Sequence, residues 1–282
     1  MAPPTWPRRR AELQITTMWR YPVKSMLGEQ VDEVHVAPEG LARDRALAVV
    51  DSATGMVATA KHPRLWRDLL TYSARSDGDH VRITSPSGWT LDAPARDVDA
   101  RLSKALGRVV RICSERPDGA SVERPAPEDV LAEGVDARVP AATVRIGQGS
   151  PGTTFVDYAP VHLITTATVE EVGTEHLRYR PNLVLRTPSG TPAYVENDWV
   201  GRELYVGDGQ AGPVLRVTLP TPRCAVPTLE HGALPRAVHA VRTLIASNRV
   251  DVPGFGAVPC AGCYVEVVRP GVSRVGDEVT LR

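Results

Sequence analysis

The 282-residue sequence has little cysteine, no excess of charge and no long apolar run, and each absence excludes a class of protein. Its cysteines, Cys113, Cys224, Cys260 and Cys263, are too few for a disulfide framework in a chain of this length. Basic and acidic residues number 33 each, which argues against a general nucleic-acid binder. No run approaches the roughly 18 apolar residues of a membrane span. The first residues are basic and rich in proline, unlike a secretory signal. We therefore expect a soluble cytoplasmic protein without nucleic-acid or membrane partners.

Common cofactor motifs are missing as well. The sequence contains no phosphate loop, no GxGxxG, no GxSxG and no HExxH. No motif for haem, flavin or an iron–sulfur cluster is encoded. Cys260 and Cys263 form a CxxC pair, which could serve zinc or redox chemistry or could simply pack in a strand and turn. No second CxxC is present to complete a four-ligand zinc site, and both interpretations stay open.

Short β-branched and apolar runs separated by turns predict a β-rich α+β fold of about two domains. Strands are predicted at 13–21, 30–36, 45–51, 68–75, 80–85, 108–113, 161–166 and 180–187, and two more within 263–282. Helices are predicted at 96–107, near 167–178 and at 234–247. A stretch rich in Pro, Glu and Asp at 115–141 is the candidate for a linker or an excursion between the two halves. We expect a disordered tail at 1–13 and domains at 14–138 and 139–282.

Lysine is scarce: the chain has Lys24, Lys61 and Lys104 against thirty arginines. Lys24 and Ser25 follow Pro22, so a cation and a hydroxyl lie on a stiff turn that suits an anionic ligand such as phosphate. The ordinary alternative is a solvated strand end.

Two further polar stretches resemble this one in character. Arg43, Asp44 and Arg45 precede a buried strand, where Asp44 could pair with either arginine and pre-organise it for an anion. Arg180 and Asn182 flank a proline bend. Ion pairing and turn chemistry alone are the ordinary explanations of these residues.

Cys224 lies in the stiff segment "TPRCAVPT", next to Arg223 and between prolines. A thiolate is both a nucleophile and a ligand for soft metals, and a neighbouring cation lowers the pKa of a thiol. A buried cysteine can also act as a small hydrophobic residue. The segment therefore predicts either a reactive thiol or a packed one.

Taken in order, several stretches resemble a MOSC-domain protein with its N-terminal MOSC β-barrel domain, over about residues 14 to 282. They are "YPVKS", "GLARDRALAVVD", "MVATAKHPRL", "RPNLVL", "RCAVPT" and "GCYVEVVRPGVSRVGDEV". The functional comparison is with the mitochondrial amidoxime reducing components and bacterial single-chain relatives. The resemblance implies a MOSC β-barrel with helical insertions, preceded by a β-barrel-like domain.

The resemblance also implies a molybdenum–molybdopterin cofactor. Cys224 would then be the metal ligand and, together with Asp157 of "FVDYAP", a catalytic residue. The cofactor-binding residues implied are Lys24, Ser25, Arg45, Arg180, Asn182, Arg223 and Cys224. The chain departs from its relatives at Tyr158 and Ala159, at Thr221 and Pro222, and from Pro227 to Glu230. These positions would border the open face of the metal, where substrate is selected.

The implied function is two-electron reduction of N-hydroxylated or N-oxide small molecules. Since no electron carrier is encoded, a flavoprotein reductase, a ferredoxin or a cytochrome b5-like protein is the expected donor, and the chain is expected to be a monomer. Two alternatives stay open. Cys224 could carry a persulfide for sulfur transfer, or the protein could bind the cofactor without turning over a substrate.

Overall fold

The structure, a computed structural model, describes residues 13–207 and 211–282. Within that part of the chain the largest sheet closes into a seven-stranded barrel, because β12 pairs with β17 as well as with β13. Around the barrel the strands are β12 (Val161–Thr165), β13 (Leu183–Arg186), β1 (Leu13–Arg20), β19 (Glu278–Leu281), β14 (Glu203–Val206), β15 (Val214–Pro222) and β17 (Gly256–Arg269). Buried aliphatic side chains such as Ile15, Leu163 and Val265 fill it. The barrel is the first core of the molecule.

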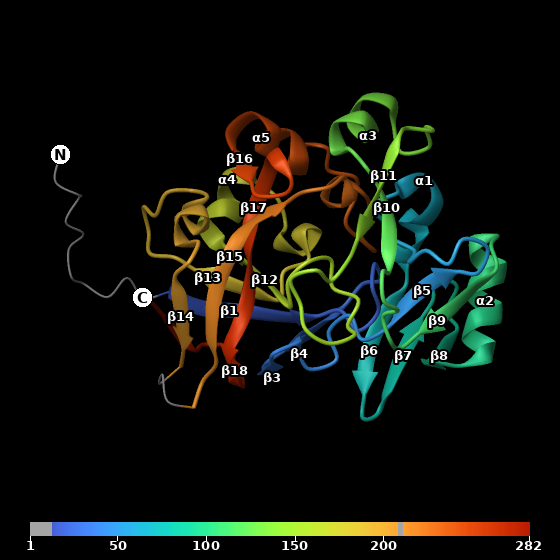
Figure 1. Ribbon diagram of the computed structural model, residues 1–282, viewed down its shortest axis with the longest axis horizontal. Coiled ribbons are helices and arrows are strands. Elements are labelled where there is room, and N and C mark those ends of the chain that lie inside the picture. Colours follow the sequence, from blue (N-terminus) through green and yellow to red (C-terminus); the bar gives the residue numbers. More distant parts are fainter. Residues whose placement is uncertain (1–12, 208–210) are drawn as a thin grey trace.

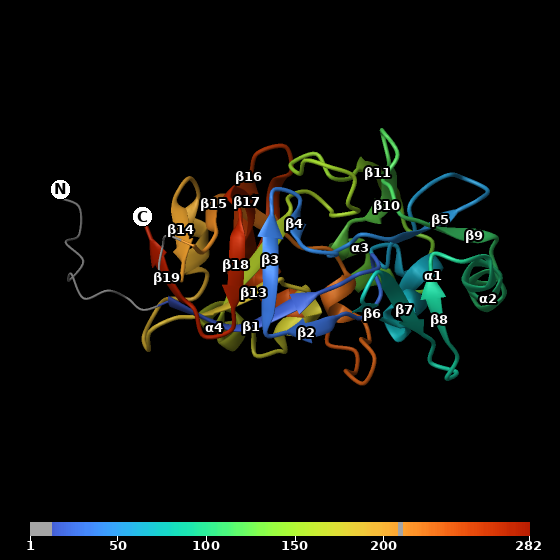
Figure 2. The ribbon, with the colours of Figure 1, turned by 90° about the horizontal axis from the view of Figure 1, so that it is seen from below.

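Two more strands extend the barrel sheet, and a small sheet lies beside it. β2 (Glu29–Val31) pairs with β1, and β16 (Arg249–Val252) pairs with β17. β3 (Glu33–Ala37) pairs with β4 (Gly40–Leu41) and with β18 (Gly271–Arg274). Figure 2 shows β3 and β18 side by side, although 234 residues separate Ala37 from Gly271 in sequence. Strands from the two ends of the chain therefore share sheets.

Three small sheets form a second region between β4 and β12. They are β5 (Ala48–Asp51) with β9 (Val110–Cys113), β6 (Ser73–Asp77) with β7 (His80–Thr84) and β8 (Thr90–Ala93), and β10 (Ser121–Pro125) with β11 (Ala141–Arg145). A separate core that includes Val49, Trp66 and Leu102 holds the first two sheets together. In Figure 1 this region, with α2, lies at the opposite end of the molecule from β14. The expected β-rich α+β class is confirmed.

Five α-helices lie outside the barrel in the described part of the chain: α1 (Pro63–Trp66), α2 (Arg96–Leu106), α3 (Pro127–Glu133), α4 (Thr166–Val172) and α5 (His239–Ser247). α2 matches its prediction, since Val98 and Leu102 are buried and Gly107 ends the helix with a left-handed φ of 63°. None of the helices described is long and apolar enough to cross a membrane.

Three sequence predictions about elements need correction. Residues 115–141 are not an open linker, because β10 and α3 form there and bury Val122 and Val130. The strand expected from residue 68 begins only at Ser73, after the 3₁₀ helix η1 (Arg67–Thr71). The helix expected from residue 234 begins at His239. Pro235 explains why Leu234 lies outside the helix, because proline disfavours the helical conformation for the residue before it.

Other elements agree with their predictions in kind and differ at their ends. The helix expected near 167–178 is α4 followed by the 3₁₀ helix η2 (His176–Tyr179). Two further 3₁₀ helices are present. η3 (Val195–Trp199) precedes β14, and η4 (Val226–Thr228) follows β15. The expected tail at 1–13 lies outside the described residues except for Leu13, which begins β1.

Candidate functional site

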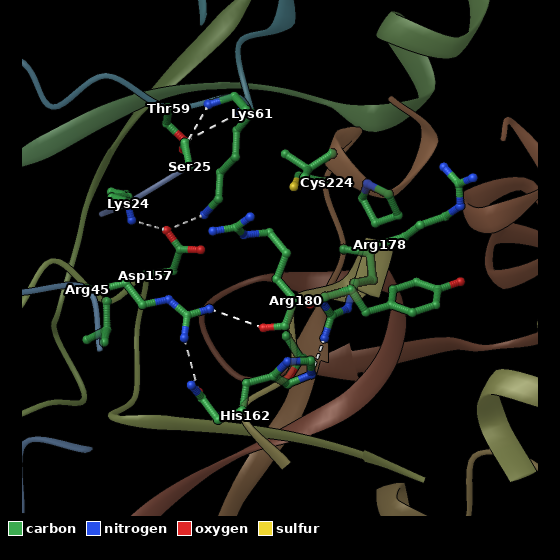
Figure 3. Close-up of a pocket in the computed structure, with 18 of the residues that line it drawn as sticks. Lys24, Ser25, Arg45, Thr59, Lys61, Asp157, His162, Arg178, Arg180 and Cys224 are labelled. Carbon is green, nitrogen blue, oxygen red and sulfur yellow. Dashed lines mark hydrogen bonds and ion pairs between the residues drawn. The ribbon is translucent and has the colours of Figure 1, made fainter. Parts of the chain in front are cut away.

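A pocket of about 730 Å³, including space open to solvent, is lined by both regions of the molecule. Loops around the ends of β1, β5, β12, β13 and β15 supply its walls. Figure 3 shows its polar side chains converging from separate segments. Every site residue named from the sequence lines this pocket: Lys24, Ser25, Arg45, Asp157, Arg180, Asn182, Arg223 and Cys224. Folding thus brings together residues up to 200 positions apart.

Three of these residues have a left-handed backbone. Ser25 has a φ of 66°, Arg45 of 47° and Arg180 of 53°. Residues with a Cβ rarely adopt this region, and such strain persists where the surrounding structure enforces it. Ser25 Oγ accepts from the Ala60 N–H at 3.1 Å, which fixes one of these turns. The surrounding structure therefore holds these loop residues in an intrinsically unfavourable backbone conformation.

Lys24 and Lys61 hold Asp157 between them. The distances from Asp157 Oδ1 are 2.5 Å to Lys24 Nζ and 2.8 Å to Lys61 Nζ, and Lys24 also donates to the Phe155 carbonyl at 2.8 Å. Burial lowers the pKa of Lys24 to about 8, although Asp157 opposes the shift. For Asp157 burial favours the neutral acid, but the two lysines outweigh it and hold the pKa well below its usual range. Asp157 is thus an anionic partner that orients two cations.

Asp44 and Asn182 fix the side chain of Arg45. Arg45 Nη1 donates to the buried Asp44 carboxylate and, at 3.2 Å, to Asn182 Oδ1. Arg45 Nη2 donates to the Arg180 carbonyl at 3.1 Å. Of the two pairings expected for Asp44, the structure shows that with Arg45, while Arg43 contacts Asp79. Asn182 therefore supports a cation of the pocket from within its turn.

The pocket carries far more positive than negative charge. Its cationic lining residues are Lys24, Arg45, Lys61, Arg178, Arg180 and Arg223, and Asp157 is the acidic one among the described residues that line it. Arg180 extends into the pocket in Figure 3, and burial lowers the pKa of its guanidinium to about 10. A pocket of this composition attracts an anionic ligand.

Cys224 lies between β15 and η4 on a different wall of the pocket. It is buried, and its side chain packs in an apolar cluster with Ala60, Leu70, Val226 and Leu229. Figure 3 shows its sulfur on the side of Cys224 that faces Lys61. The thiol thus combines an apolar surrounding with access to a cationic pocket.

Arg223 makes contacts with protein groups that were not foreseen from the sequence. Its Nε donates to the Ala261 carbonyl at 2.9 Å and its Nη1 to the Tyr179 carbonyl at 3.0 Å. Its Nη2 contacts Ala261 O and the Nε2 of the buried His162. Burial, with help from Arg223, holds the pKa of His162 well below its usual range, so the imidazole is neutral and can accept. These bonds anchor the residue next to Cys224 to β17.

The CxxC pair is placed differently. Cys260 and Cys263 are both fully buried in β17, where burial raises the pKa of the Cys260 thiol to about 11. In the antiparallel pairing of β15 with β17, Pro220 lies opposite Cys263 and Pro222 lies opposite Cys260. Two steps along β15 therefore correspond to three steps along β17. The extra residue forms a bulge at Gly262, whose φ is +70°. In the described residues no group of three or more His, Cys, Asp or Glu could hold a metal ion.

Sequence reasoning missed three basic residues of the pocket: Lys61, His162 and Arg178. Lys61 carried a signal, because lysine is scarce and "MVATAKHPRL" was among the stretches of resemblance. Arg178 is 1% exposed, pairs with Glu175 at 2.6 Å and donates to the Leu229 carbonyl at 3.2 Å. Nothing in the sequence distinguished it from the other arginines.

Two family models match the chain: the MOSC N-terminal beta barrel domain at residues 12–116 and the MOSC domain at residues 151–280. The chain therefore belongs to the family of proteins that join these two domains, as its motifs indicated.

Among characterised proteins the chain is similar to the mitochondrial amidoxime-reducing component 1 of Mus musculus and of Homo sapiens. The mouse protein is 26% identical over 98% of this chain and 85% of its own length, and the human protein is 24% identical over 98% and 86%. Among solved structures, the YuaD protein from Bacillus subtilis covers 97% of both chains at 10% identity, with a TM-score of 0.45.

Proposed function

We propose that the protein is a molybdenum-cofactor oxidoreductase with Cys224 as the metal ligand, and that it reduces N-hydroxylated or N-oxide small molecules. The observation that carries the proposal is that the thiol of Cys224 lines a strongly cationic pocket. Cysteine thiolate is a ligand for soft metals, and guanidinium and ammonium groups hold phosphate. Relatives named for amidoxime reduction match the chain over nearly its whole length.

The residues of the pocket fit the group that the family implies. Lys24, Arg45 and Arg180 would hold its anionic phosphate, with Ser25 and Asn182 fixing their turns. Thr221 Oγ1 is buried at the pocket without a hydrogen-bond partner among the described residues. A buried hydroxyl without a partner is costly, which fits a position that a bound ligand completes.

When bound, the molybdenum centre would supply the two-electron chemistry. Asp157 pairs with Lys24 and Lys61 and so holds both side chains in place at the pocket. The backbone next to Cys224 is held by Arg223, so the thiolate occupies one position. Ala60, Leu70 and Val226 exclude water from one side of the sulfur. The segment from Pro227 to Glu230 borders this wall and would influence which substrate is accepted.

The reaction requires an external reductant. Converting an N–OH group to N–H and water consumes two electrons and two protons. Because the sequence encodes no haem, flavin or iron–sulfur motif, we propose that a flavoprotein reductase, a ferredoxin or a cytochrome b5-like protein delivers the electrons. The protein is proposed to act as a monomer on small-molecule substrates.

Metal and pterin analysis of the full chain, produced in a host that makes the molybdenum cofactor, tests the proposal. We expect about one molybdenum and one pterin per chain, and reduction of a benzamidoxime-type substrate by the chemically reduced protein. A persulfide on Cys224 without pterin would instead identify a sulfur carrier. Bound pterin without turnover would indicate a protein that only binds the cofactor.

A further inference from the structure

The ring of Tyr21 contacts the guanidinium groups of two pocket arginines. The guanidinium carbons of Arg45 and Arg180 lie 4.6 Å and 4.3 Å from the centre of its ring. Both distances are within the range of a cation–π interaction, which is stronger when the groups are shielded from water. Tyr21 is 2% exposed, so these contacts are shielded. One ring therefore interacts with two like charges that repel each other.

Backbone bonds lock the same three residues together. The Tyr21 N–H donates to Asp44 Oδ1 at 2.8 Å, and the Arg45 N–H donates to the Tyr21 carbonyl at 2.8 Å. The carboxylate of Asp44 thus contacts both Tyr21 and the Arg45 side chain. Since Arg45 also binds the Arg180 carbonyl, the ring and the two cations form one unit.

The ring is tightly enclosed on a further side. A Cβ at Gly28 would lie 2.6 Å from the Tyr21 ring and 2.2 Å from the Arg20 carbonyl. Contacts of this length are not tolerated, so Gly28 leaves the space that the ring occupies. The position of the ring is therefore set by its surroundings and not by the arginines alone.

The hydroxyl of Tyr21 takes no part in these contacts. Its oxygen is buried without a hydrogen-bond partner among the described residues, and burial raises the pKa of the phenol. The face of the ring, and not the hydroxyl, is thus the group that contacts the pocket cations. This separation allows the two parts of the side chain to be tested independently.

We propose that Tyr21 is a positioning residue whose ring holds Arg45 and Arg180 in the arrangement that receives an anionic ligand. The inference rests on the proposed function in that both arginines are taken to hold an anion. It goes beyond that function in naming the side chain that aligns two guanidiniums on left-handed residues. It predicts that an aromatic face at position 21 is required, while the hydroxyl is not.

The test compares Tyr21→Phe, Tyr21→Leu and Tyr72→Leu in the full chain made without the molybdenum cofactor. Tyr72 is a matched control, because it is also buried but packs against Trp89 in the second core. Calorimetric titration with inorganic sulfate measures affinity, and urea denaturation measures stability. We expect Tyr21→Leu to weaken sulfate binding on the order of tenfold. Tyr21→Phe and Tyr72→Leu should stay within about twofold of the wild type.

Sulfate binding by Tyr21→Leu as tight as in the wild type would overturn the proposal, and so would an equal loss in Tyr21→Phe. Crystal structures of the wild type and Tyr21→Leu provide a second measurement that needs no ligand. Displaced Arg45 and Arg180 guanidiniums would support the proposal, and unchanged ones would contradict it.

The proposed function fails separately, through absence of molybdenum in protein from a competent host. If molybdenum were absent, a sulfate affinity that depends on Tyr21 would still support the positioning role. Conversely, protein from a competent host could contain molybdenum while the sulfate affinity of the cofactor-free protein does not depend on Tyr21. That result would leave the proposed function intact and remove only the positioning role.

Discussion

The loop that carries Cys224 and the strand that carries Cys260 and Cys263 show two uses of cysteine in one molecule. Cys224 lies at the wall of a cationic pocket, on the short segment between β15 and η4. Cys260 and Cys263 lie inside β17, fully buried, with their thiol pKa values raised by burial. The CxxC pair, for which metal chemistry and simple packing were both left open, is therefore packed in the strand. Surroundings, more than spacing, separate a thiol that lines a pocket from one in the core.

The important residues of the CxxC stretch are those between the cysteines. Ala261 offers its carbonyl to Arg223, and Gly262 forms the bulge that brings this carbonyl into place. The Gly262 N–H donates to Glu196 Oε1 at 3.1 Å. The strand thus supports the Cys224 loop through its backbone, and its two thiols are not needed for that support.

The largest contrast is expected from Cys224→Ser. A hydroxyl is a far poorer ligand for a soft metal than a thiolate, so molybdenum content and reductase activity should fall roughly a hundredfold or more. The urea midpoint should change little, because serine is nearly isosteric. Elemental analysis and turnover of a benzamidoxime-type substrate measure the effect, and full turnover in this variant would refute the ligand assignment.

Gly262→Ala should disturb the part of β17 that binds Arg223, and should destabilise the fold. A Cβ there would lie 2.3 Å from the Leu163 carbonyl and 2.6 Å from His162 Nε2, at a φ of +70°. Left-handed strain and overpacking together should lower the free energy of unfolding by about 3 kcal/mol. Gly254→Ala is the matched control, because its φ is +79° but nothing lies within 4 Å of the added carbon. It should cost about 1 kcal/mol, and equal losses in urea denaturation would contradict the clash.

The pH dependence of sulfate binding should reflect the titration of Lys24 in the pocket and not that of Cys260 in β17. Lys24 binds the anion while protonated, and its folded pKa is about 8, so affinity should fall as the pH rises from 7 to 9.5. The fall should be about tenfold, since one charge is lost. Cys260 should remain protonated over this range, because burial raises the pKa of its thiol to about 11. Affinity measured by titration should become weak and nearly flat with pH in Lys24→Met. The exposed Lys104→Met is the control, and a flat wild-type profile would exclude Lys24 from the anion site.

The smallest effect is expected from Cys260→Ala. Truncating this buried thiol should lower the free energy of unfolding by about 1 kcal/mol through a small cavity. Molybdenum content and activity should match the wild type, because the Ala261 carbonyl stays in place. Loss of molybdenum from this variant without loss of stability would show that the pair has a direct role after all.

Local sequence patterns predicted the helices and strands that are set by residue spacing, end residues and β-branched runs. The helix at 96–107 was evident because Val98 and Leu102 repeat at helical spacing and Gly107 can end the helix. Most strands were evident from β-branched runs. The 3₁₀ helix at Arg67–Thr71 was missed because the same apolar residues also suit a strand, and only packing in the second core selects between them.

Eight residues of the candidate site were also foreseen, but Lys61, His162 and Arg178 were not, and neither were the contacts between the site residues. Arg223 was expected to face the cofactor, whereas the structure gives its guanidinium three protein partners on other segments. The contact of Lys61 with Asp157 joins segments 96 residues apart, which no local pattern encodes.

The sequence alone determined the class of fold, the family and the set of chemically competent side chains, because periodicity, turn residues and ordered motifs are local properties. Only the tertiary structure decided which cysteine faces a pocket, which charges pair and which ring contacts two arginines. Those outcomes depend on burial and on contacts between distant segments. The pKa of Lys24, the neutral state of His162 and the left-handed turns at Arg45 and Arg180 all arise in this way.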